Sequence, residues 1–230
     1  MKKSVLSSIF TLALLTIFFS GCALAPTPAP VSSPTKGSST GGVTTTFADV
    51  PSSYWAYSLI ERLYAAGITA ECSTNPLSYC PENSVAQAEM AIFLEKGMRG
   101  SAYTPPAGTG LVFADVPISY WAVNWIEKSF ADGITAGCGG GNYCPENPVT
   151  RAEMAVFLLK AKHGAAYTPP AAAGIFSDVP TDYWSAPWIE QLYAEGITSG
   201  CSLTPLSYCP ERSVTRAEMA VFLVLTFNLP

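Results

Sequence analysis

The chain has 230 residues, of which 49% are hydrophobic, 12% aromatic and 13% charged. This composition is too apolar for a disordered chain, and the length is sufficient for a hydrophobic core. The formal charge of −5 offers no basic surface to nucleic acid, and the single histidine, His163, leaves little for histidine-based catalysis or metal binding. We therefore expect a folded protein with no nucleic-acid partner, no metal and no cofactor.

The N-terminus carries an export signal. Lys2 and Lys3 precede an apolar run over residues 5–19, which is too short to span a bilayer. The segment Phe19-Ser-Gly-Cys22 ends this run and resembles a bacterial lipobox, in which cleavage before the cysteine is coupled to its lipidation. We expect residues 1–21 to be a lipoprotein signal peptide and Cys22 to be the lipidated membrane anchor. An ordinary signal peptide cut after Ala25 is the alternative.

A tether follows the anchor. Residues 22–46 are rich in Pro, Ser, Thr and Gly and have almost no bulky side chain to bury. We expect this segment to hold the folded part of the protein away from the membrane.

Three copies of one pattern, with a period of about 65 residues, make up the rest of the chain. Each copy opens with Phe-x-Asp-Val-Pro and a Tyr-Trp pair, and continues with an amphipathic stretch such as Leu59, Ile60, Leu63 and Tyr64, which predicts a helix. Each helix should end at a Gly-Ile-Thr turn, because glycine suits the left-handed position after a helix. The three glycines are Gly67, Gly133 and Gly196.

A second helix closes each copy. In copies two and three it begins with the T-x-x-E spacing of a capping box, at Thr150 and Glu153 and again at Thr215 and Glu218. The first copy has Ala86 in place of the threonine and Gln87 in place of the following arginine. We therefore expect the first copy to have lost part of what the other two do.

These motifs resemble the S-layer homology (SLH) family, with its F-x-D-V opening, its G-I-T turn and its T-R-A-E segment. The resemblance covers residues 47–100, 111–164 and 174–230 as three repeats. It implies a mainly α fold, in which three helix-loop-helix repeats pack around a pseudo-threefold axis and grooves between repeats bind cell-wall polysaccharide, often through acidic ketal-pyruvate groups. The apolar patterns of the residues also indicate a helical fold of three joined repeats. Two short helices cannot bury their own apolar faces, and three units can share one core.

Six of the seven cysteines form local pairs within the loops that connect the two helices of each copy. In an exported protein this pattern predicts one disulfide in each connecting loop. A zinc site is the alternative, which the lack of C-x-x-C pairs and of clustered histidines disfavours. The expected pairs are Cys72/Cys80, Cys138/Cys144 and Cys201/Cys209.

A site for an acidic glycan needs guanidinium donors, aromatic faces for stacking and carboxylate acceptors. The repeats supply each type at matching positions. The alternatives are that the tryptophans belong to the core, that the aspartates cap the next turn, and that the arginines are solvated residues of a first helical turn. The predicted glycan-binding residues are Asp49, Trp55, Asp115, Trp121, Arg151, Asp178, Trp184 and Arg216.

The sequence therefore predicts an exported, non-catalytic anchoring module of the cell envelope. It would link a membrane, through lipidated Cys22, to wall polysaccharide or peptidoglycan. We expect an outer membrane or the cell surface, because Ala23 rather than an acidic residue follows the lipobox. Envelope proteins are further candidate partners, and a disulfide-stabilised structural or protein-interaction scaffold without glycan binding is the alternative function. No common catalytic motif occurs in the sequence.

Overall fold

The computed structural model describes residues 45–230, which lie within one compact unit. The expected signal peptide, the expected lipidation site Cys22 and all but the last two residues of the expected tether lie outside the described residues. Helices dominate the described part of the chain, so the prediction of a mainly α fold is confirmed.

A short helix and a longer helix alternate along the chain. The short helices are α1 (Tyr57–Ala65), α3 (Val123–Ala131) and α5 (Ala186–Ala194). The longer helices are α2 (Gln87–Arg99), α4 (Arg151–His163) and α6 (Arg216–Phe227). Two-residue strands form a hairpin in the first loop, β1 (Ser73–Thr74) with β2 (Leu77–Ser78), and in the third, β3 (Ser202–Leu203) with β4 (Leu206–Ser207).

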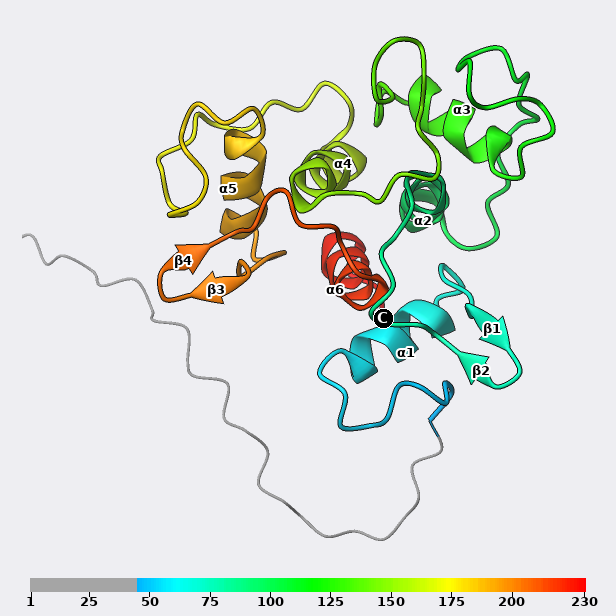
Figure 1. Cartoon of the computed structure of the whole chain (residues 1–230), viewed down its shortest axis with the longest axis horizontal. Helices are drawn as coiled ribbons and strands as arrows, with labels where there is room; N and C mark the ends of the chain where they lie inside the picture. The colour runs from blue at the N-terminus through cyan, green and yellow to red at the C-terminus, as the bar shows by residue number, and fades with distance from the viewer. Residues whose placement is uncertain (1–44) are drawn as a thin grey trace, which may run out of the picture. The chain divides into compact units, whose positions relative to one another are not determined.

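The longer helices form the centre of the molecule. Helices α2, α4 and α6 contact one another pairwise and are seen nearly end-on in Figure 1, with the short helices around them. Each short helix packs on the central helix of the preceding repeat: α3 packs on α2, α5 on α4, and α1 on α6. The last contact joins the first repeat to the third, so the arrangement closes into a ring.

Backbone hydrogen bonds link the three repeats at the starts of the central helices. The N–H of Val85 donates to the carbonyl of Val214 at 3.0 Å, that of Val214 to Val149 at 2.9 Å, and that of Val149 to Val85 at 2.9 Å. All three valines are fully buried. The three repeats therefore meet around a pseudo-threefold axis and satisfy one another's backbone groups.

The capping boxes at Thr150 and Thr215 are confirmed. The Thr150 hydroxyl accepts from the N–H of Glu153 at 3.2 Å, and the Glu153 carboxylate accepts from the N–H of Thr150 at 2.8 Å. In the first repeat, Glu89 still accepts from the N–H of Ala86 at 2.9 Å, but the alanine has no hydroxyl to return the bond.

Each connecting loop contains the expected disulfide. The three bonds are Cys72–Cys80, Cys138–Cys144 and Cys201–Cys209. The second cysteine of each pair has a positive φ of 55–60°. The prediction of one disulfide in each loop is therefore confirmed for all six cysteines.

The loop of the second repeat nevertheless differs from the other two. Cys144 follows Cys138 by 6 positions, whereas the second cysteine follows the first by 8 positions in the other loops. A single bridge between Gly139 and Asn142 stands where the other loops have a pair of two-residue strands. The Cys138–Cys144 disulfide thus closes a tighter turn, because the loop is too short for the hairpin.

The helix-ending turns and the shared core are also as predicted. Gly67, Gly133 and Gly196 each have a φ of 69°. One large apolar cluster takes residues from all three repeats, which confirms the shared core, and a smaller cluster lies around Phe113.

Candidate functional site: a groove at the junction of three repeats

A groove of about 280 Å³ lies where the three repeats meet. We call it groove 1. The turn after α1 and the outer side of α2 form two of its walls, Trp121 of the second repeat forms another, and Arg216 of the third repeat closes it. Its apolar lining consists of Ile68, Ile92 and Phe93, and its charged lining of Glu71, Glu89, Lys96 and Arg216. The structure thus brings two of the predicted site residues, Trp121 and Arg216, into one hollow, and the other six do not line it.

The three predicted tryptophans are exposed. Trp55, Trp121 and Trp184 keep 63%, 61% and 58% of their surface accessible, so the alternative that they belong to the core is wrong. Each lies beside the preceding tyrosine, with ring centroids 5.8–5.9 Å apart. An exposed indole of this kind is free to stack on a ligand.

Arg216 is buried in the junction between the first and third repeats, with 6% of its surface exposed. Its Nε donates to the carbonyl of Tyr79 at 2.8 Å and its Nη2 to that of Ala70 at 2.7 Å, while Nη1 lies 3.4 Å from Oε1 of Glu89. The hydroxyl of Tyr79 returns a bond to the carbonyl of Arg216 at 2.9 Å. Arg216 and Tyr79 therefore tie the two repeats together in both directions.

Arg151 occupies the equivalent place between the second and third repeats. Its Nε donates to the carbonyl of Tyr208 at 2.8 Å, and its Nη1 lies 3.2 Å from Oε1 of Glu218. Only 2% of Arg151 is exposed, and its Nη2 is buried without a hydrogen-bond partner among the described residues. Burial lowers the pKa of this guanidinium. The alternative that the two arginines are solvated residues of a first turn is therefore wrong.

The position of the two arginines in the remaining copy is held by Gln87. The hydroxyl of Tyr143 donates to the backbone carbonyl of Gln87 at 2.8 Å, so the tyrosine half of the link is kept. Gln87 is the first residue of α2, and its backbone N–H donates to the carbonyl of Asn147 in the loop of the second repeat at 2.9 Å. Each junction therefore takes its arginine or glutamine from a repeat other than the one that supplies the Gly-Ile-Thr turn.

The three predicted aspartates hold the cysteine loops. The carboxylate of Asp49 accepts from the N–H groups of Tyr79 and Cys80, at 2.8 and 2.7 Å. Asp115 and Asp178 bind the corresponding pairs at the same distances to within 0.1 Å. These bonds go to a loop about 30 residues away rather than to the proline-containing turn that follows each aspartate, and none of the three aspartates lines groove 1.

The second cysteine of each pair therefore has two structural roles. Cys144 closes the disulfide with Cys138, and its N–H donates to Oδ2 of Asp115 at 2.7 Å. Cys80 and Cys209 do the same in the first and third repeats. The aspartate and the disulfide together fix the loop that leads into each central helix.

Asp49 and Asp178 each lie close to two cysteine sulfurs, as a metal site would require. Those sulfurs are joined in disulfides, and a disulfide sulfur is not the thiolate that binds zinc. Among the described residues, Asp115 does not form such a group with Cys138 and Cys144, although it makes the same bonds to its loop. The aspartate bonds to the loop therefore explain the closeness in the other two repeats.

Three glutamates that the sequence analysis did not select fix the start of each repeat. The Glu190 carboxylate accepts from the N–H groups of Ala173, Gly174 and Ile175 at 2.6–2.9 Å. Burial alone would raise the pKa of Glu190, but these three donors outweigh it and leave the pKa below its ordinary value. Glu61 and Glu127 bind the equivalent segments. The signal was the glutamate that recurs at the same place in every copy.

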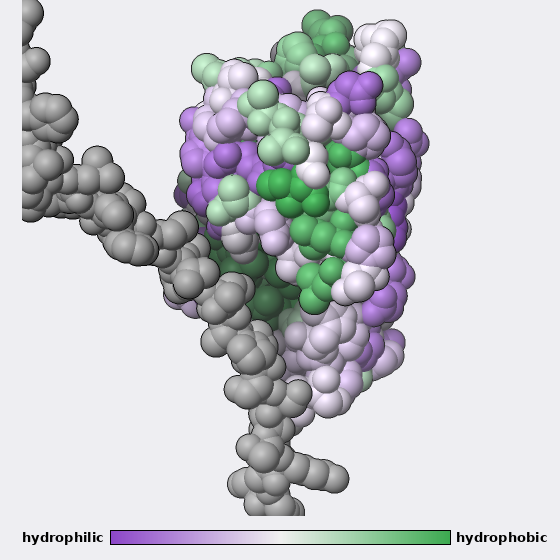
Figure 2. Space-filling model, turned by 90° about the vertical axis from the view of Figure 1, so that its left-hand side faces the viewer, coloured by the Kyte–Doolittle hydropathy of each residue, from purple (hydrophilic) through white to green (hydrophobic). Residues whose placement is uncertain are grey.

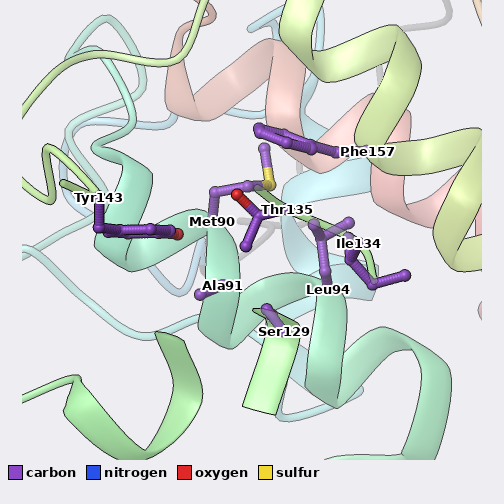
Figure 3. Close-up of a pocket in the computed structure, with 8 residues that line it drawn as sticks. All are labelled: Met90, Ala91, Leu94, Ser129, Ile134, Thr135, Tyr143 and Phe157. Atoms are coloured by element: carbon purple, nitrogen blue, oxygen red, sulfur yellow. The ribbon is translucent and has the colours of Figure 1, made fainter. Parts of the chain in front are cut away.

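A second, smaller hollow lies under the turn after α3. Figure 3 shows its lining, which includes Met90 and Leu94 of α2, Phe157 of α4, and Ser129. Its volume of about 10 Å³ is the space of a single water molecule, so it is too small for a sugar. Ser129 stands where the other two copies have Leu63 and Leu192, and this smaller side chain lines the hollow.

The middle of the chain is similar to a known protein family. Residues 112–155 match the family model of the S-layer homology domain. The chain is 26% identical over 140 residues to a cellulosome-anchoring protein of Acetivibrio thermocellus, which is 60% of this chain and 31% of that protein. It is 29% identical over 126 residues to the S-layer protein EA1 of Bacillus anthracis, which is 55% of this chain and 14% of that protein.

An enzyme is also among the relatives. The chain is 34% identical over 110 residues to endo-1,4-beta-xylanase A of Thermoanaerobacterium saccharolyticum, which is 48% of this chain and 9% of that protein. The chain thus spans less than a third of the length of each of these three relatives. These relatives are named as an anchoring protein, an S-layer protein and an enzyme, and the family model of the S-layer homology domain matches residues 112–155 of this chain.

Proposed function

We propose that the chain is a non-catalytic anchoring module that binds cell-wall polysaccharide or a peptidoglycan-linked glycan in grooves between three SLH repeats. The repeats would be residues 47–100, 111–164 and 174–230, which extends the matched segment to the two copies that share its motifs. The observation that carries the proposal is groove 1, in which an exposed tryptophan, an apolar lining and charged walls meet in one hollow.

The chemistry of groove 1 suits a sugar. Sugar rings have apolar C–H faces that pack on an indole and hydroxyl groups that need polar partners. The volume of about 280 Å³ is close to the lower end of small-molecule sites, and Trp121 is exposed on its wall. Known relatives named for the S-layer and for cellulosome anchoring support a role at the cell surface.

The predicted site residues take two different roles in this proposal. Trp55, Trp121 and Trp184 would contact the glycan directly, because they are exposed. Arg151 and Arg216 would shape the groove walls from buried positions. The aspartates would position the loops that frame the grooves. They are Asp49, Asp115 and Asp178.

The proposal includes a second attachment, to a membrane. It rests on the sequence of residues 1–46, in which the lipobox ends at Cys22 and a tether follows. No helix in the described part of the chain is long and apolar enough to cross a membrane. The lipid would hold the exported protein at an outer membrane or the cell surface, while the folded part binds the wall.

Sedimentation with purified sacculi tests the wall-binding proposal. Full-length chain should sediment with intact sacculi and much less with sacculi stripped of wall polysaccharide, if that polymer is the ligand. Trp121→Ala should weaken sedimentation about tenfold, whereas Leu203→Ala, which shortens another exposed apolar side chain, should not. Equal sedimentation of wild type and Trp121→Ala would contradict the role of groove 1.

Labelling with a fatty-acid analogue tests the membrane attachment separately. The wild-type chain should incorporate the label, and Cys22→Ser should not. Absence of label in the wild type would contradict the lipid anchor and leave a protein held by the wall alone.

Exposed apolar surface outside groove 1 favours one second candidate, a protein-interaction scaffold. Leu111, Ile118 and Leu203 are 88%, 69% and 75% exposed. Figure 2 shows hydrophobic residues gathered between hydrophilic ones on the side of the molecule that carries α5 and the β3–β4 hairpin. Leu203 lies in the β3–β4 hairpin on this side, whereas Leu111 and Ile118 precede α3 in the second repeat. If sacculi fail to retain the protein, the side that carries α5 and the β3–β4 hairpin is the next candidate for a partner.

A further inference from the structure

The arginine of groove 1 has little left to offer a ligand. Arg216 directs Nε to the carbonyl of Tyr79, Nη2 to the carbonyl of Ala70, and Nη1 towards Glu89. A carboxylate is bound tightly by arginine when two parallel N–H donors are free to meet its two oxygens. In groove 1 these donors are already committed to the protein.

The two remaining charges in the groove oppose each other. Lys96 has its Nζ 3.5 Å from the carbonyl of Gly67, and it offers the only other positive charge of the lining. Glu71 lies in the same lining, and no hydrogen bond or ion pair of the described residues engages its carboxylate. Arg216 and Glu89 offset each other as an ion pair, so an acidic ligand attracted by Lys96 would meet the repulsion of Glu71 in a hollow where water screens charge less than in bulk.

The same groove suits an uncharged sugar. Glu71 is free to accept hydrogen bonds from hydroxyl groups, and Lys96 is free to donate to hydroxyl or amide oxygens. Trp121 supplies the aromatic face, and Ile92 and Phe93 supply apolar contact. None of these contacts needs a charge on the ligand.

We propose that groove 1 selects an uncharged hexose or N-acetylhexosamine and rejects acidic sugars, with Glu71 as the residue that determines this selectivity. The inference rests on the proposed wall-binding function and departs from the acidic glycan expected from the sequence. The positions equivalent to Glu71 are Gly137 and Gly200, so the selection belongs to groove 1 alone.

Two disaccharides that differ in one carboxylate test the inference. The first is di-N-acetylchitobiose, and the second carries a lactyl carboxylate on one of its two N-acetylglucosamine rings. Binding to the full-length protein in detergent would be measured by calorimetry and by tryptophan fluorescence at 50 and 500 mM salt. We expect the uncharged sugar to bind at least tenfold more tightly, with an affinity that changes less than twofold with salt.

Variants assign the selectivity to Glu71. Glu71→Gln should bring the two dissociation constants to within about threefold of each other, because the acidic sugar should bind more tightly to this variant. Asp182→Asn removes one exposed negative charge outside groove 1 and should leave the tenfold preference unchanged. Trp121→Ala should weaken binding of the uncharged sugar about tenfold.

The outcomes separate this inference from the proposed function. If wild type binds the acidic sugar as tightly as the uncharged one, or if Asp182→Asn acts like Glu71→Gln, the inference is wrong. If sacculi retain the protein but neither disaccharide binds, the inference is also wrong while wall binding stands. If neither sacculi nor disaccharides bind, both fail.

Discussion

At the scale of single residues, the buried arginines act first on stability. Arg216 joins the first and third repeats through the carbonyls of Tyr79 and Ala70 and through Glu89. Its guanidinium carbon also lies 4.7 Å from the centre of the Tyr79 ring, within the range of a cation–π contact. Loss of sugar binding in a variant of this arginine would therefore need a stability control before it could be read as loss of a ligand contact.

We expect Arg216→Ala to lower the free energy of unfolding by about 3 kcal/mol, because it leaves buried carbonyls and Glu89 without their partner. Urea denaturation followed by circular dichroism measures this. Arg212→Ala is the matched control, since its side chain is 45% exposed and pairs with Glu218 at the surface. That variant should change stability by less than about 1 kcal/mol. Equal effects of the two variants would contradict the structural role of Arg216.

Glu190 should make stability depend on pH in the acid range. The pKa of its carboxyl is lower in the folded protein than in the unfolded chain, because three backbone N–H groups bind the charged form against the effect of burial. The unfolded chain therefore binds more protons between the two pKa values. The contribution is fully present above the unfolded pKa of about 4.3 and is lost as the pH falls through the folded pKa.

We expect Glu190→Gln to destabilise the protein by about 2 kcal/mol at pH 7 and by progressively less as the pH falls below about 4. Unfolding measured at several pH values gives the difference curve. Glu71→Gln is the control, because no hydrogen bond of the described residues engages that carboxylate. A difference in stability between wild type and Glu190→Gln that stays constant from pH 7 to pH 3 would rule out the hydrogen bonds of the charged carboxylate as its cause.

Residue types were predictable from the sequence where the pattern was local. The capping roles of Thr150 and Thr215 follow from four consecutive residues, and the pairing of Cys138 with Cys144 joins two neighbours in one loop; the structure confirms both. The bonds of Glu190 to residues 173–175 join distant parts of the chain. A glutamate recurs at this position in each copy, which marks the position as important. Its spacing in the sequence does not identify the partner that the fold brings close.

At the scale of elements, the interface between α2 and α3 differs from its two counterparts. Glu95 of α2 is fully buried where α4 and α6 have Leu159 and Val224, and it faces Ser129 of α3. The Ser129 hydroxyl donates to Oε1 of Glu95 at 3.1 Å, and Arg99 pairs with the other carboxylate oxygen. A buried glutamate at position 95 and a serine at position 129 would each be unfavourable alone, and their hydrogen bond makes them compensate each other.

We expect a double-mutant cycle to reveal this compensation. Ser129→Leu alone should destabilise the protein by about 2 kcal/mol, because it removes a partner from a buried carboxylate. Glu95→Leu combined with Ser129→Leu should be at least as stable as wild type, because it restores the apolar contact present between α4 and α5. Thermal unfolding of the four proteins measures the coupling. Additive effects would contradict the pairing.

The charge of Glu95 adds a second observable to this cycle. Burial is the main cause that raises the pKa of its carboxyl above the ordinary value, against the opposing effect of Arg99. The folded protein then binds more protons than the unfolded chain between the two pKa values, so this residue makes stability fall as the pH rises through that window. The double variant should lack this decrease.

The positions of the helices were predictable, but their pairing was not. Apolar spacing and turn glycines located α1 and its counterparts, because both signals act within a few residues. Ser129 replaces a leucine that the other two copies have at this position, but its partner Glu95 lies 34 residues earlier in a different helix. Only the packing of α3 on the central helix of the preceding repeat explains why a serine is tolerated there.

At the scale of the whole molecule, ring closure makes the three repeats interdependent. The first repeat supplies α1, which packs on α6 of the third, and the valine hydrogen bonds at the axis depend on all three repeats. The large core takes residues from every repeat. A repeat removed from the ring would leave unsatisfied backbone groups and exposed apolar surface on both neighbours.

We expect residues 45–230 to unfold in one cooperative step. The amide protons of Val85, Val149 and Val214 should exchange with the same opening free energy, and that value should equal the global stability. Arg216→Ala should lower all three by the same amount, although Val149 lies in a repeat that the arginine does not join. Hydrogen exchange monitored by nuclear magnetic resonance tests this. Protection of Val149 that survives in Arg216→Ala would indicate independent folding of the repeats.

The ring also explains why the groove was only partly predictable. Trp121, Arg216 and Glu71 come from three different repeats, and the sequence treats each copy as a unit with its own tryptophan and arginine. Trp121 and Arg216 were among the predicted residues and Glu71 was not, and the sequence did not predict that the three lie in one groove. The grouping depends on which repeat follows which around the axis, and this is a property of the closed ring rather than of any single copy.

A closed ring of this kind places a limit on how the gene can change. Each outer helix completes its packing on a helix encoded one repeat earlier, and α1 completes its packing on the last one. Duplication or deletion of one repeat would open the ring or crowd it, whereas duplication of all three would give two complete modules. Descendants of this sequence should therefore gain or lose the pattern in sets of three, and recombination points should lie outside residues 45–230 rather than between repeats.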